Sequence, residues 1–287
     1  MYNEICNLKF LREILKKYDI KLSKSLGQNF LINRGICTKI VKLSQINKHT
    51  GVLEIGPGGG VLTFDLALKA KKVVAVEIDK KLIPVLNYTL KNFNNIKILK
   101  GNILNIDIKK LINEEFKEFD DIIVCANIPY YITSQIIMRF LEEKINVKSI
   151  FVMVQKEAAL RMCSKPGHSS CGAISYSVRY FSYPKILFNV SKGSFFPTPK
   201  VDSCLILLEI RKEPAIKVEN EEMFFKLIKS TFLERRKTIK NPIRTRMNFT
   251  KEQVLKALKE SNIPSSSRAQ ELSLEQFGVL SNLISKI

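Results

Sequence analysis

The 287-residue sequence has little of what metal centres and membrane spans require. It contains two histidines and no tryptophan, and its six cysteines show no paired metal-ligand spacing. Apolar runs stay well short of the roughly 20 residues that cross a bilayer, and the first residues do not resemble a secretory signal. We therefore expect no bound metal, reduced cysteines and a cytoplasmic protein without a membrane segment.

Negative charge is also scarce. Lysine and arginine number 47 against 27 aspartates and glutamates, which gives a net charge of +20. Such a charge attracts polyanions, nucleic acid first among them, although a lysine-rich composition bias is the alternative. The segment 235–246 favours nucleic acid because it holds six basic residues and no acid. These residues are Arg235, Arg236, Lys237, Lys240, Arg244 and Arg246.

Strand-like and helix-like segments alternate through the first two thirds of the chain. This alternation predicts an α/β fold with a doubly wound, mostly parallel sheet. No helix separates the last two strands, so we expect a late antiparallel strand. The predicted strands are 51–55, 72–78, 96–100, 121–126, 148–154, 185–190 and 201–210, with helices such as 80–91 and 134–143 between them.

The two ends of the chain have a different character. Residues 8–17 have the pattern of a basic amphipathic helix, within an N-terminal basic segment 1–24. After residue 210 the chain has the pattern of amphipathic helices interrupted at Pro242 and near 261–267. We predict two domains, a catalytic one over 1–210 and a small helical one over 211–287.

A glycine-rich loop follows the first of the predicted strands and opens a helix. A dinucleotide fingerprint would need glycine where Val61 stands. The spacing of Glu54, Gly56, Gly58 and Gly60 is instead typical of S-adenosylmethionine sites, which cradle no pyrophosphate. A simple tight turn is the alternative interpretation.

Two further polar residues follow strands. Glu77 lies 21 residues after Gly56, where a carboxylate can accept both ribose hydroxyls of an adenosine-containing cofactor. Asn102 follows the next strand, where its amide can donate to an adenine ring nitrogen and accept from the amino group. The alternatives are a solvated strand end for Glu77 and a turn residue for Asn102.

The segment Asn127-Ile128-Pro129-Tyr130 closes a buried strand in an unusual way. The side-chain oxygen of Asn127 and the carbonyl of Ile128 can each accept a hydrogen bond from one amino group. Pro129 fixes the backbone, and Tyr130 offers a face on which a nucleobase can stack. Beside a methyl donor, this pattern indicates transfer to a planar amine, whereas a strand-to-turn corner with a surface tyrosine is the plain alternative.

At this point the chain resembles the small-subunit ribosomal RNA adenine N6,N6-dimethyltransferases (the KsgA type). The resemblance runs from about Lys21 to near the C-terminus and rests on motifs that occur in family order. They are Lys24-Ser-Leu-Gly-Gln-Asn-Phe-Leu31, Glu54–Gly60, Asn127-Ile-Pro-Tyr130, Phe195-Phe-Pro-Thr-Pro-Lys-Val-Asp-Ser203 and Phe232-Leu-Glu-Arg-Arg-Lys-Thr238.

The resemblance implies a Rossmann-like class I methyltransferase sheet with a small C-terminal helical domain. It implies S-adenosylmethionine as cofactor and dimethylation of two adjacent adenosines in a hairpin loop near the 3′ end of small-subunit rRNA. The partner would be an assembling small ribosomal subunit, and nothing demands more than a monomer. Asn29, the backbone of Leu31, Gly56, Glu77, Asn102 and Asn127 would surround the cofactor, and Phe195 would help to clamp the target base opposite Tyr130. The alternative for Phe195 is a core aromatic residue.

The RNA-facing residues are expected at Lys24 and along the basic run Arg235, Arg236, Lys237 and Lys240, with a solvated lysine and a solvated helix face as the alternatives. Two positions depart from the family pattern. The family usually has aspartate where this chain has Asn102, which retains one acceptor oxygen. Pro242 stands where the family tends to have leucine, and we expect it to end the helix of the basic run early.

Three rival functions remain open from the sequence. The large-subunit rRNA adenine methyltransferases share the glycine loop and the Asn-x-Pro-Tyr core, but the Lys-Ser-Leu-Gly-Gln lead-in and the Arg-Arg-Lys-Thr run argue against them. An assembly or transcription factor would bind without catalysis, against which Glu54, Glu77 and Asn127 argue. DNA adenine methylation is weakened by the lack of an evident sequence-reading domain.

Overall fold

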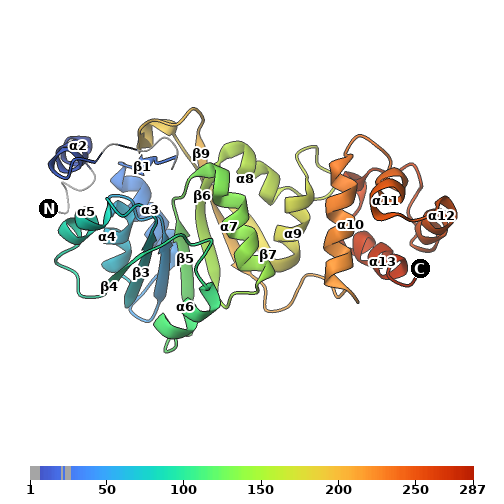
Figure 1. The fold of residues 1–287 in the computed structure, drawn as a ribbon, viewed down its shortest axis with the longest axis horizontal. Helices are drawn as coiled ribbons and strands as arrows, with labels where there is room; N and C mark the ends of the chain where they lie inside the picture. Colours follow the sequence, from blue (N-terminus) through green and yellow to red (C-terminus); the bar gives the residue numbers. More distant parts are fainter. Residues whose placement is uncertain (1–6, 21, 23–26) are drawn as a thin grey trace. The chain divides into compact units, whose positions relative to one another are not determined.

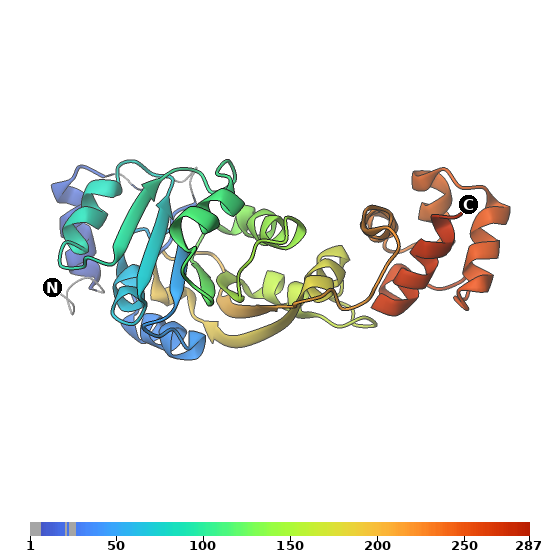
Figure 2. The ribbon, with the colours of Figure 1, turned by 90° about the horizontal axis from the view of Figure 1, so that it is seen from below.

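A seven-stranded sheet carries the first part of the chain. The computed structural model describes residues 7–20, 22 and 27–287 (Figure 1). The strands lie in the order β4-β3-β2-β5-β6-β9-β7, and helices cover both sides of the sheet (Figure 2). The bounds are β2 Gly51–Ile55, β3 Lys72–Glu77, β4 Ile96–Lys100, β5 Ile122–Ala126, β6 Ser149–Gln155, β7 Ser182–Val190 and β9 Ser203–Ile210.

The central strands are buried on both faces. Every residue of β2 and β5 is buried, as expected for parallel strands covered by helices. Strands β2 to β6 pair in parallel, and β9 runs antiparallel to β6 with Val152 opposite Ile206. The predicted α/β class and its late antiparallel strand are confirmed.

The helices of this part connect the strands. They are α3 Arg34–Ser44, α4 Val61–Ala67, α5 Ile83–Thr89, α6 Ile108–Glu115, α7 Tyr130–Glu142 and α8 Lys156–Cys163. The prediction for 80–91 was too long at both ends. Helix α7 begins four residues earlier than predicted, directly after Pro129, whose extended backbone forms the N-cap.

The N-terminal helix α2 (Leu8–Lys17) matches the prediction for 8–17. The side chain of Asn7 caps it by accepting from the backbone N–H of Lys9. Its apolar face is buried, through Leu11, Ile14 and Leu15, in a cluster with Phe30 and Leu82. The next segment includes the short strand β1 (Phe30–Leu31), which pairs antiparallel with β8 (Phe195–Phe196).

The chain divides into two compact units, one of residues 1–159 and 185–210 and the other of 160–184 and 211–287. The chain passes from one unit to the other at three places, and the predicted boundary at residue 210 is one of them. The stretch 160–184, which we assigned to the first domain, belongs to the second unit. The physical reason is aromatic packing: the ring of Tyr176 lies 5.0 Å from that of Phe277, and Tyr180 lies 5.2 Å from Phe224.

The second unit contains α9 (Ala173–Phe181), α10 (Glu221–Leu233), α11 (Lys240–Met247), α12 (Lys251–Glu260) and α13 (Leu274–Ile284). Helix α10 ends at Leu233, before the basic run, and α11 starts at Lys240. Pro242 therefore does not end a helix early, and that expectation was wrong. It lies in the first turn of α11, where backbone N–H groups have no partner within the helix, so proline costs no hydrogen bond.

Candidate active site

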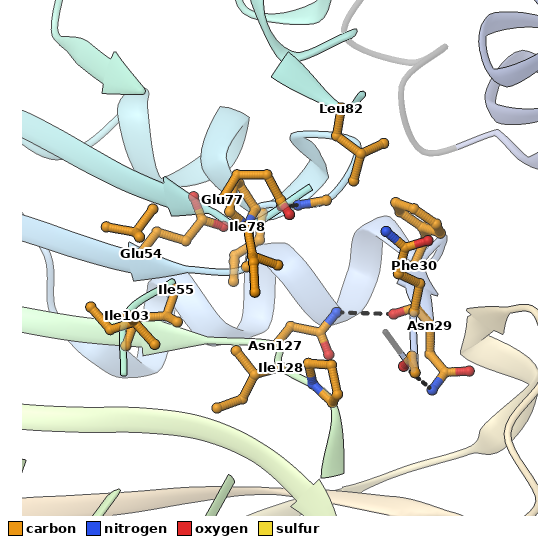
Figure 3. A pocket seen from close by; sticks show the side chains of 18 of the residues that line it. Asn29, Phe30, Glu54, Ile55, Glu77, Ile78, Leu82, Ile103, Asn127 and Ile128 are labelled. Atoms are coloured by element: carbon orange, nitrogen blue, oxygen red, sulfur yellow. Dashed lines mark hydrogen bonds between the residues drawn. The ribbon is translucent and has the colours of Figure 1, made fainter. Parts of the chain in front are cut away.

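A pocket opens at the carboxyl ends of β2, β3 and β5 (Figure 3). These strands lie side by side because β2 pairs with both β3 and β5. The chain leaves β2 in one direction across the sheet and returns on its other side, which is where doubly wound sheets bind ligands. The pocket brings together most of the predicted site residues: Asn29, Leu31, Glu54, Gly56, Gly58, Glu77, Asn102, Asn127, Ile128, Pro129 and Tyr130 line it.

The glycine loop forms the floor of this pocket. Gly58 has φ +58°, and a Cβ there would lie 3.0 Å from the Cδ1 atom of Phe30. Gly60 does not line the pocket. It caps α4 with φ +87°, and a Cβ there would lie 3.0 Å from the hydroxyl of Thr89. Gly60 therefore shapes the loop and does not contact the pocket, whereas Gly56 and Gly58 contact it directly.

Glu77 links the loop to the end of β3. One carboxylate oxygen accepts from the backbone N–H of Gly58 at 3.2 Å, and the other accepts from that of Asp79 at 2.8 Å. Burial raises the pKa of Glu77, and these two hydrogen bonds oppose the rise. Each carboxylate oxygen has a second lone pair, so both can also accept from ribose hydroxyls.

Glu54 is the most deeply buried acid of the pocket. It is 1% exposed, and its Oε2 atom has no hydrogen-bond partner. Burial raises the pKa of Glu54 to about 8; the hydroxyl of Thr63 opposes the rise and the charge of Glu77 adds to it. An orphaned carboxyl in a pocket is costly unless a ligand pairs with it. A cationic ligand such as S-adenosylmethionine, with its sulfonium and amino groups, suits this position.

Asn127 follows β5 directly. Its side-chain nitrogen donates to the backbone carbonyl of Asn29 at 3.4 Å, a long bond that leaves the side-chain oxygen as an acceptor for a ligand (Figure 3). The side chain of Asn29 is itself held by donating to the carbonyl of Gly27 at 3.2 Å. The predicted Asn29 and Asn127 thus lie together at one wall of the pocket.

Tyr130 lies in the first turn of α7 and is half-buried. Its hydroxyl forms a 2.7 Å hydrogen bond with that of Ser203, which begins β9 and is fully buried. The serine belongs to the motif that begins at Phe195, so the two motifs meet in space through this bond. The ring of Tyr130 is therefore fixed from its far end.

Phe195 is not at the pocket. It is 1% exposed and lies in the main hydrophobic core, with its backbone paired to Leu31 in the β1–β8 ladder. The neighbouring Phe196 is more exposed and has the guanidinium of Arg12 5.1 Å from its ring centre. The expected clamp between Phe195 and Tyr130 is not assembled in this structure, because alternation along β8 turns the first of the two rings inward.

Asn102 lines the pocket, but its side-chain oxygen accepts from the backbone N–H of Leu104 at 3.0 Å. This leaves the amide nitrogen, and the second lone pair of the oxygen, for a ligand. An adenine ring nitrogen is a suitable acceptor for the amide nitrogen. The asparagine therefore offers a donor at this position, where an ionised aspartate would offer acceptors only.

The pocket also contains residues that sequence reasoning missed, and Leu11 and Tyr131 are two of them. Leu11 reaches the pocket from helix α2, and Tyr131 lies at its edge with 67% of its surface exposed. The amphipathic pattern of 8–17 indicated a buried face but not what it covers. For Tyr131, the signal in the sequence was its position as a second aromatic residue directly after Tyr130.

The basic run belongs to the second unit. Arg236 and Lys237 are exposed and Lys240 is half-buried. Arg235 is occupied within the unit, since it donates to the side chain of Gln270 at 3.3 Å and to the carbonyl of Ser169. Lys24 lies outside the described residues.

In the described part of the chain, no three histidine, cysteine, aspartate or glutamate side chains gather as a metal site would need. No helix among residues 7–20, 22 and 27–287 is long and apolar enough to cross a membrane.

A doubly wound sheet with this loop and this acidic pocket defines an S-adenosylmethionine-dependent methyltransferase of class I. The family model for ribosomal RNA adenine dimethylase matches residues 20–286. The chain belongs to this family, and its expected family and activity class are confirmed.

Named relatives agree with this assignment. A protein of Alkaliphilus oremlandii called ribosomal RNA small subunit methyltransferase A is 44% identical over 99% of both chains. The protein of that name from Bacillus licheniformis is 42% identical over 96% of both. Among solved structures, a dimethyladenosine transferase from Plasmodium falciparum superposes with a TM-score of 0.73 at 27% identity, covering 86% of this chain and 94% of that one.

The 23S rRNA methyltransferase ErmE shares the fold, with a TM-score of 0.68 at 22% identity, over 90% of this chain and all of that one. This similarity concerns the fold alone. The same fold thus occurs in an enzyme named for 23S rRNA, so the fold alone does not identify the rRNA that is methylated.

Proposed function

We propose that the protein transfers methyl groups from S-adenosylmethionine to the 6-amino groups of two adjacent adenosines in a hairpin loop near the 3′ end of small-subunit rRNA. The observation that carries the proposal is the strand end at Asn127. There, Asn127 and Ile128 line the same pocket as Glu54 and Glu77, and the side chain of Asn127 and the backbone of Ile128 each carry an acceptor oxygen. The names of the 42–44% identical relatives support the small subunit as the target.

The chemistry asks mainly for positioning. The adenine amino group is a poor nucleophile because its lone pair is delocalised into the ring. The two acceptors at Asn127 and Ile128 would hold its hydrogens and favour the tetrahedral nitrogen that forms during transfer. When bound, S-adenosylmethionine supplies the methyl group on its sulfonium. Glu54 and Glu77 would hold its cationic and ribose parts.

Tyr130 would stack on the target base. Its hydroxyl bond to Ser203 fixes the ring, so little side-chain entropy is lost when the base arrives. The base must leave its own stack to reach Asn127, at a cost of a few kcal/mol that a single-stranded loop reduces. Phe195 would take part only if its ring moved out of the core.

The partner in this proposal is rRNA within an assembling small subunit, bound by a monomer in the cytoplasm. The unit that contains the sheet would catalyse methyl transfer, and the helical unit of residues 160–184 and 211–287 would bind RNA through Arg236, Lys237 and Lys240. Phosphate contacts of this kind position a protein without reading sequence, so the shape of the RNA would select the site.

The test is methyl transfer from labelled cofactor to small subunits purified from a strain that lacks the modification, with the modified bases mapped by primer extension. We expect label at two adjacent adenosines near the 3′ end. Label on large subunits instead would support the rival rRNA substrate. Tight particle binding without any transfer would support a binding-only role.

A further inference from the structure

Thr63 carries a buried hydroxyl that has no hydrogen-bond partner within the part of the chain that the structure describes. The residue is completely buried and lies in the first turn of α4, directly after the glycine loop. A threonine hydroxyl in a helix can bond to the carbonyl three or four residues before it, but that of Thr63 does not. A buried hydroxyl without a partner costs free energy, so an acceptor for it has to be sought nearby.

The acceptor that lies beside it is the carboxyl of Glu54. The hydroxyl of Thr63 is close enough to this carboxyl to lower the pKa of Glu54, although no hydrogen bond of ordinary geometry joins the two side chains. The Oε2 atom of Glu54 is buried and also lacks a partner among the described residues. A group that can donate and a group that can accept thus lie next to each other, and neither is satisfied.

The other titratable groups around Glu54 come from the two neighbouring strands. The charge of Glu77, on β3, raises the pKa of Glu54. Cys125 lies opposite Glu54 on β5, and burial together with the charge of Glu54 raises the pKa of its thiol. A carboxylate cannot donate and a thiol donates only weakly, so Thr63 supplies the hydroxyl donor among these groups. Glu54 lines the pocket and Thr63 does not, so any effect of Thr63 on a ligand passes through Glu54.

We infer that Thr63 is a positioning residue of the cofactor site, whose hydroxyl donates to the carboxylate of Glu54 when S-adenosylmethionine binds. The cationic groups of the cofactor favour the carboxylate over the neutral acid, and Thr63 then supplies the donor that Oε2 lacks. A hydrogen bond to a charged acceptor is stronger than one to a neutral acceptor, so Thr63 favours the ionised form of Glu54. The inference rests on the cofactor site of the proposed function and adds a residue behind it.

This role predicts opposite effects on stability and on binding. Thr63→Val replaces the hydroxyl by a methyl group and keeps the shape of the side chain. In the free protein the hydroxyl has no partner to lose, so we expect the variant to melt at the temperature of the wild type or above it. The same change removes the donor that favours the ionised Glu54, so cofactor binding should weaken. A threonine that only packs in the core would not weaken binding while stability is kept.

The test is calorimetry of S-adenosylmethionine binding to the full chain without RNA, from about pH 6.5 to about pH 9.5, with thermal melting of each variant. We expect Thr63→Val to bind roughly tenfold more weakly than the wild type at pH 7, the size of one hydrogen bond to a charged group. The difference should shrink to about twofold or less at the highest pH, because Glu54 is then ionised in both free proteins. At pH 8, where Glu54 of the wild type is about half ionised, Thr63→Val should release more protons on binding.

Two further variants serve as controls. Thr63→Ser keeps the hydroxyl and should stay within about twofold of the wild type at every pH. Thr231→Val removes a buried hydroxyl from the second unit, where it donates to the carbonyls of Leu227 and Ile228. It should leave cofactor affinity and its pH dependence unchanged, since Thr231 does not line the pocket.

The second arm repeats the substitution beside Glu54→Gln, whose side chain cannot ionise. There we expect Thr63→Val to change affinity by about twofold or less and to leave proton release unchanged. A loss of affinity that is equal at every pH, a tenfold loss that persists beside Glu54→Gln, or an unchanged affinity of Thr63→Val at pH 7 would each overturn the inference. A wild type that bound no S-adenosylmethionine at any pH would instead overturn the proposed function.

Discussion

Asn127 is the side chain on which the proposed transfer depends, because its nitrogen donates to the carbonyl of Asn29 and its oxygen is left as an acceptor. Replacing it by alanine removes that acceptor and leaves the fold of β5 intact. We expect Asn127→Ala to lose about 100-fold or more in kcat/KM, as for other preorganised hydrogen-bond partners of a transition state. Labelled methyl transfer to small subunits measures this loss.

The matched control for that prediction is Asn105→Ala, since Asn105 is exposed and does not line the pocket. Particle binding should be equal for both variants. If Asn127→Ala kept wild-type activity, Asn127 would be a corner residue and the proposed chemistry would be wrong.

Glu54 makes cofactor binding depend on pH. Its pKa of about 8 means that the carboxyl is protonated at pH 7 in the free protein. A cationic cofactor favours the carboxylate, so binding releases a proton, and affinity rises with pH until it levels off above about pH 8. Calorimetry in buffers of different ionisation enthalpy measures the released proton.

Glu54→Gln keeps the shape of the side chain but cannot titrate. Its cofactor affinity should show no rise between pH 6.5 and 8 from this group. A wild type whose proton release matched that of Glu54→Gln would show that Glu54 does not respond to the cofactor.

At the scale of elements, helix α2 is part of the pocket wall. Leu11 is 3% exposed, and its Cδ1 atom would lie 3.4 Å from a Cβ on Gly59 of the glycine loop. We expect Leu11→Ala to weaken binding of S-adenosylhomocysteine roughly threefold to tenfold, because apolar contact with the ligand and the packing of α2 are both reduced. Lys16→Ala, on the exposed face of the same helix, should bind as the wild type does, and equal affinities for the two variants would exclude α2 from the site.

The turn between α10 and α11 carries basic residues in two different environments. Arg236 and Lys237 are exposed, whereas Arg235 is bonded to Gln270 and Ser169. We expect the double variant Arg236→Ala with Lys237→Ala to weaken RNA binding and to reduce its salt dependence by about one to two units of slope, with an unchanged melting temperature. Arg235→Ala should instead lower the melting temperature by several degrees.

Filter binding at several salt concentrations and thermal melting distinguish the two outcomes. A salt slope that stayed the same in the double variant would remove this turn from the RNA-binding surface. If Arg235→Ala had the melting temperature of the wild type, Arg235 would be assigned to RNA binding together with Arg236 and Lys237.

Local patterns predicted the sheet well. The bounds predicted for β2 and β4 are the observed ones, and strand order placed Glu54, Glu77 and Asn127 at one edge. These features depend on the local pattern of apolar residues and on the parallel arrangement of the strands, and both can be predicted from short stretches of sequence. The predicted helix ends were less accurate. Pro129 caps α7 and Pro242 lies in the first turn of α11, and both positions depend on backbone geometry.

What the sequence could not provide came from contacts between distant segments. The burial of Phe195 follows from pairing of a two-residue strand with β1, and a strand that short has no pattern. The hydrogen bond of Tyr130 joins residues 73 positions apart. Arg235 looked like its neighbours until the loop at Ser169 was seen to accept from it.

At the scale of the whole molecule, the division into units changes where the chain can be cut. A protein ending at residue 210 would keep Tyr176 and Tyr180 without Phe277 and Phe224, the rings on which they pack. We expect such a protein to be aggregation-prone because two large aromatic side chains lose their cover. Sedimentation and dye binding of 1–210 beside the full chain measure this, and a soluble, monomeric 1–210 would support the simpler boundary.

The discontinuous second unit also sets an order of events while the chain is being made. The sheet has all its strands once residue 210 has emerged, but the segment 160–184 must wait for the partners that residues 211–287 bring. At roughly 5–20 residues per second, that wait lasts several seconds. During this interval the nascent chain carries a finished catalytic sheet and an unfinished aromatic core, so the last helices to be translated are the ones that complete it.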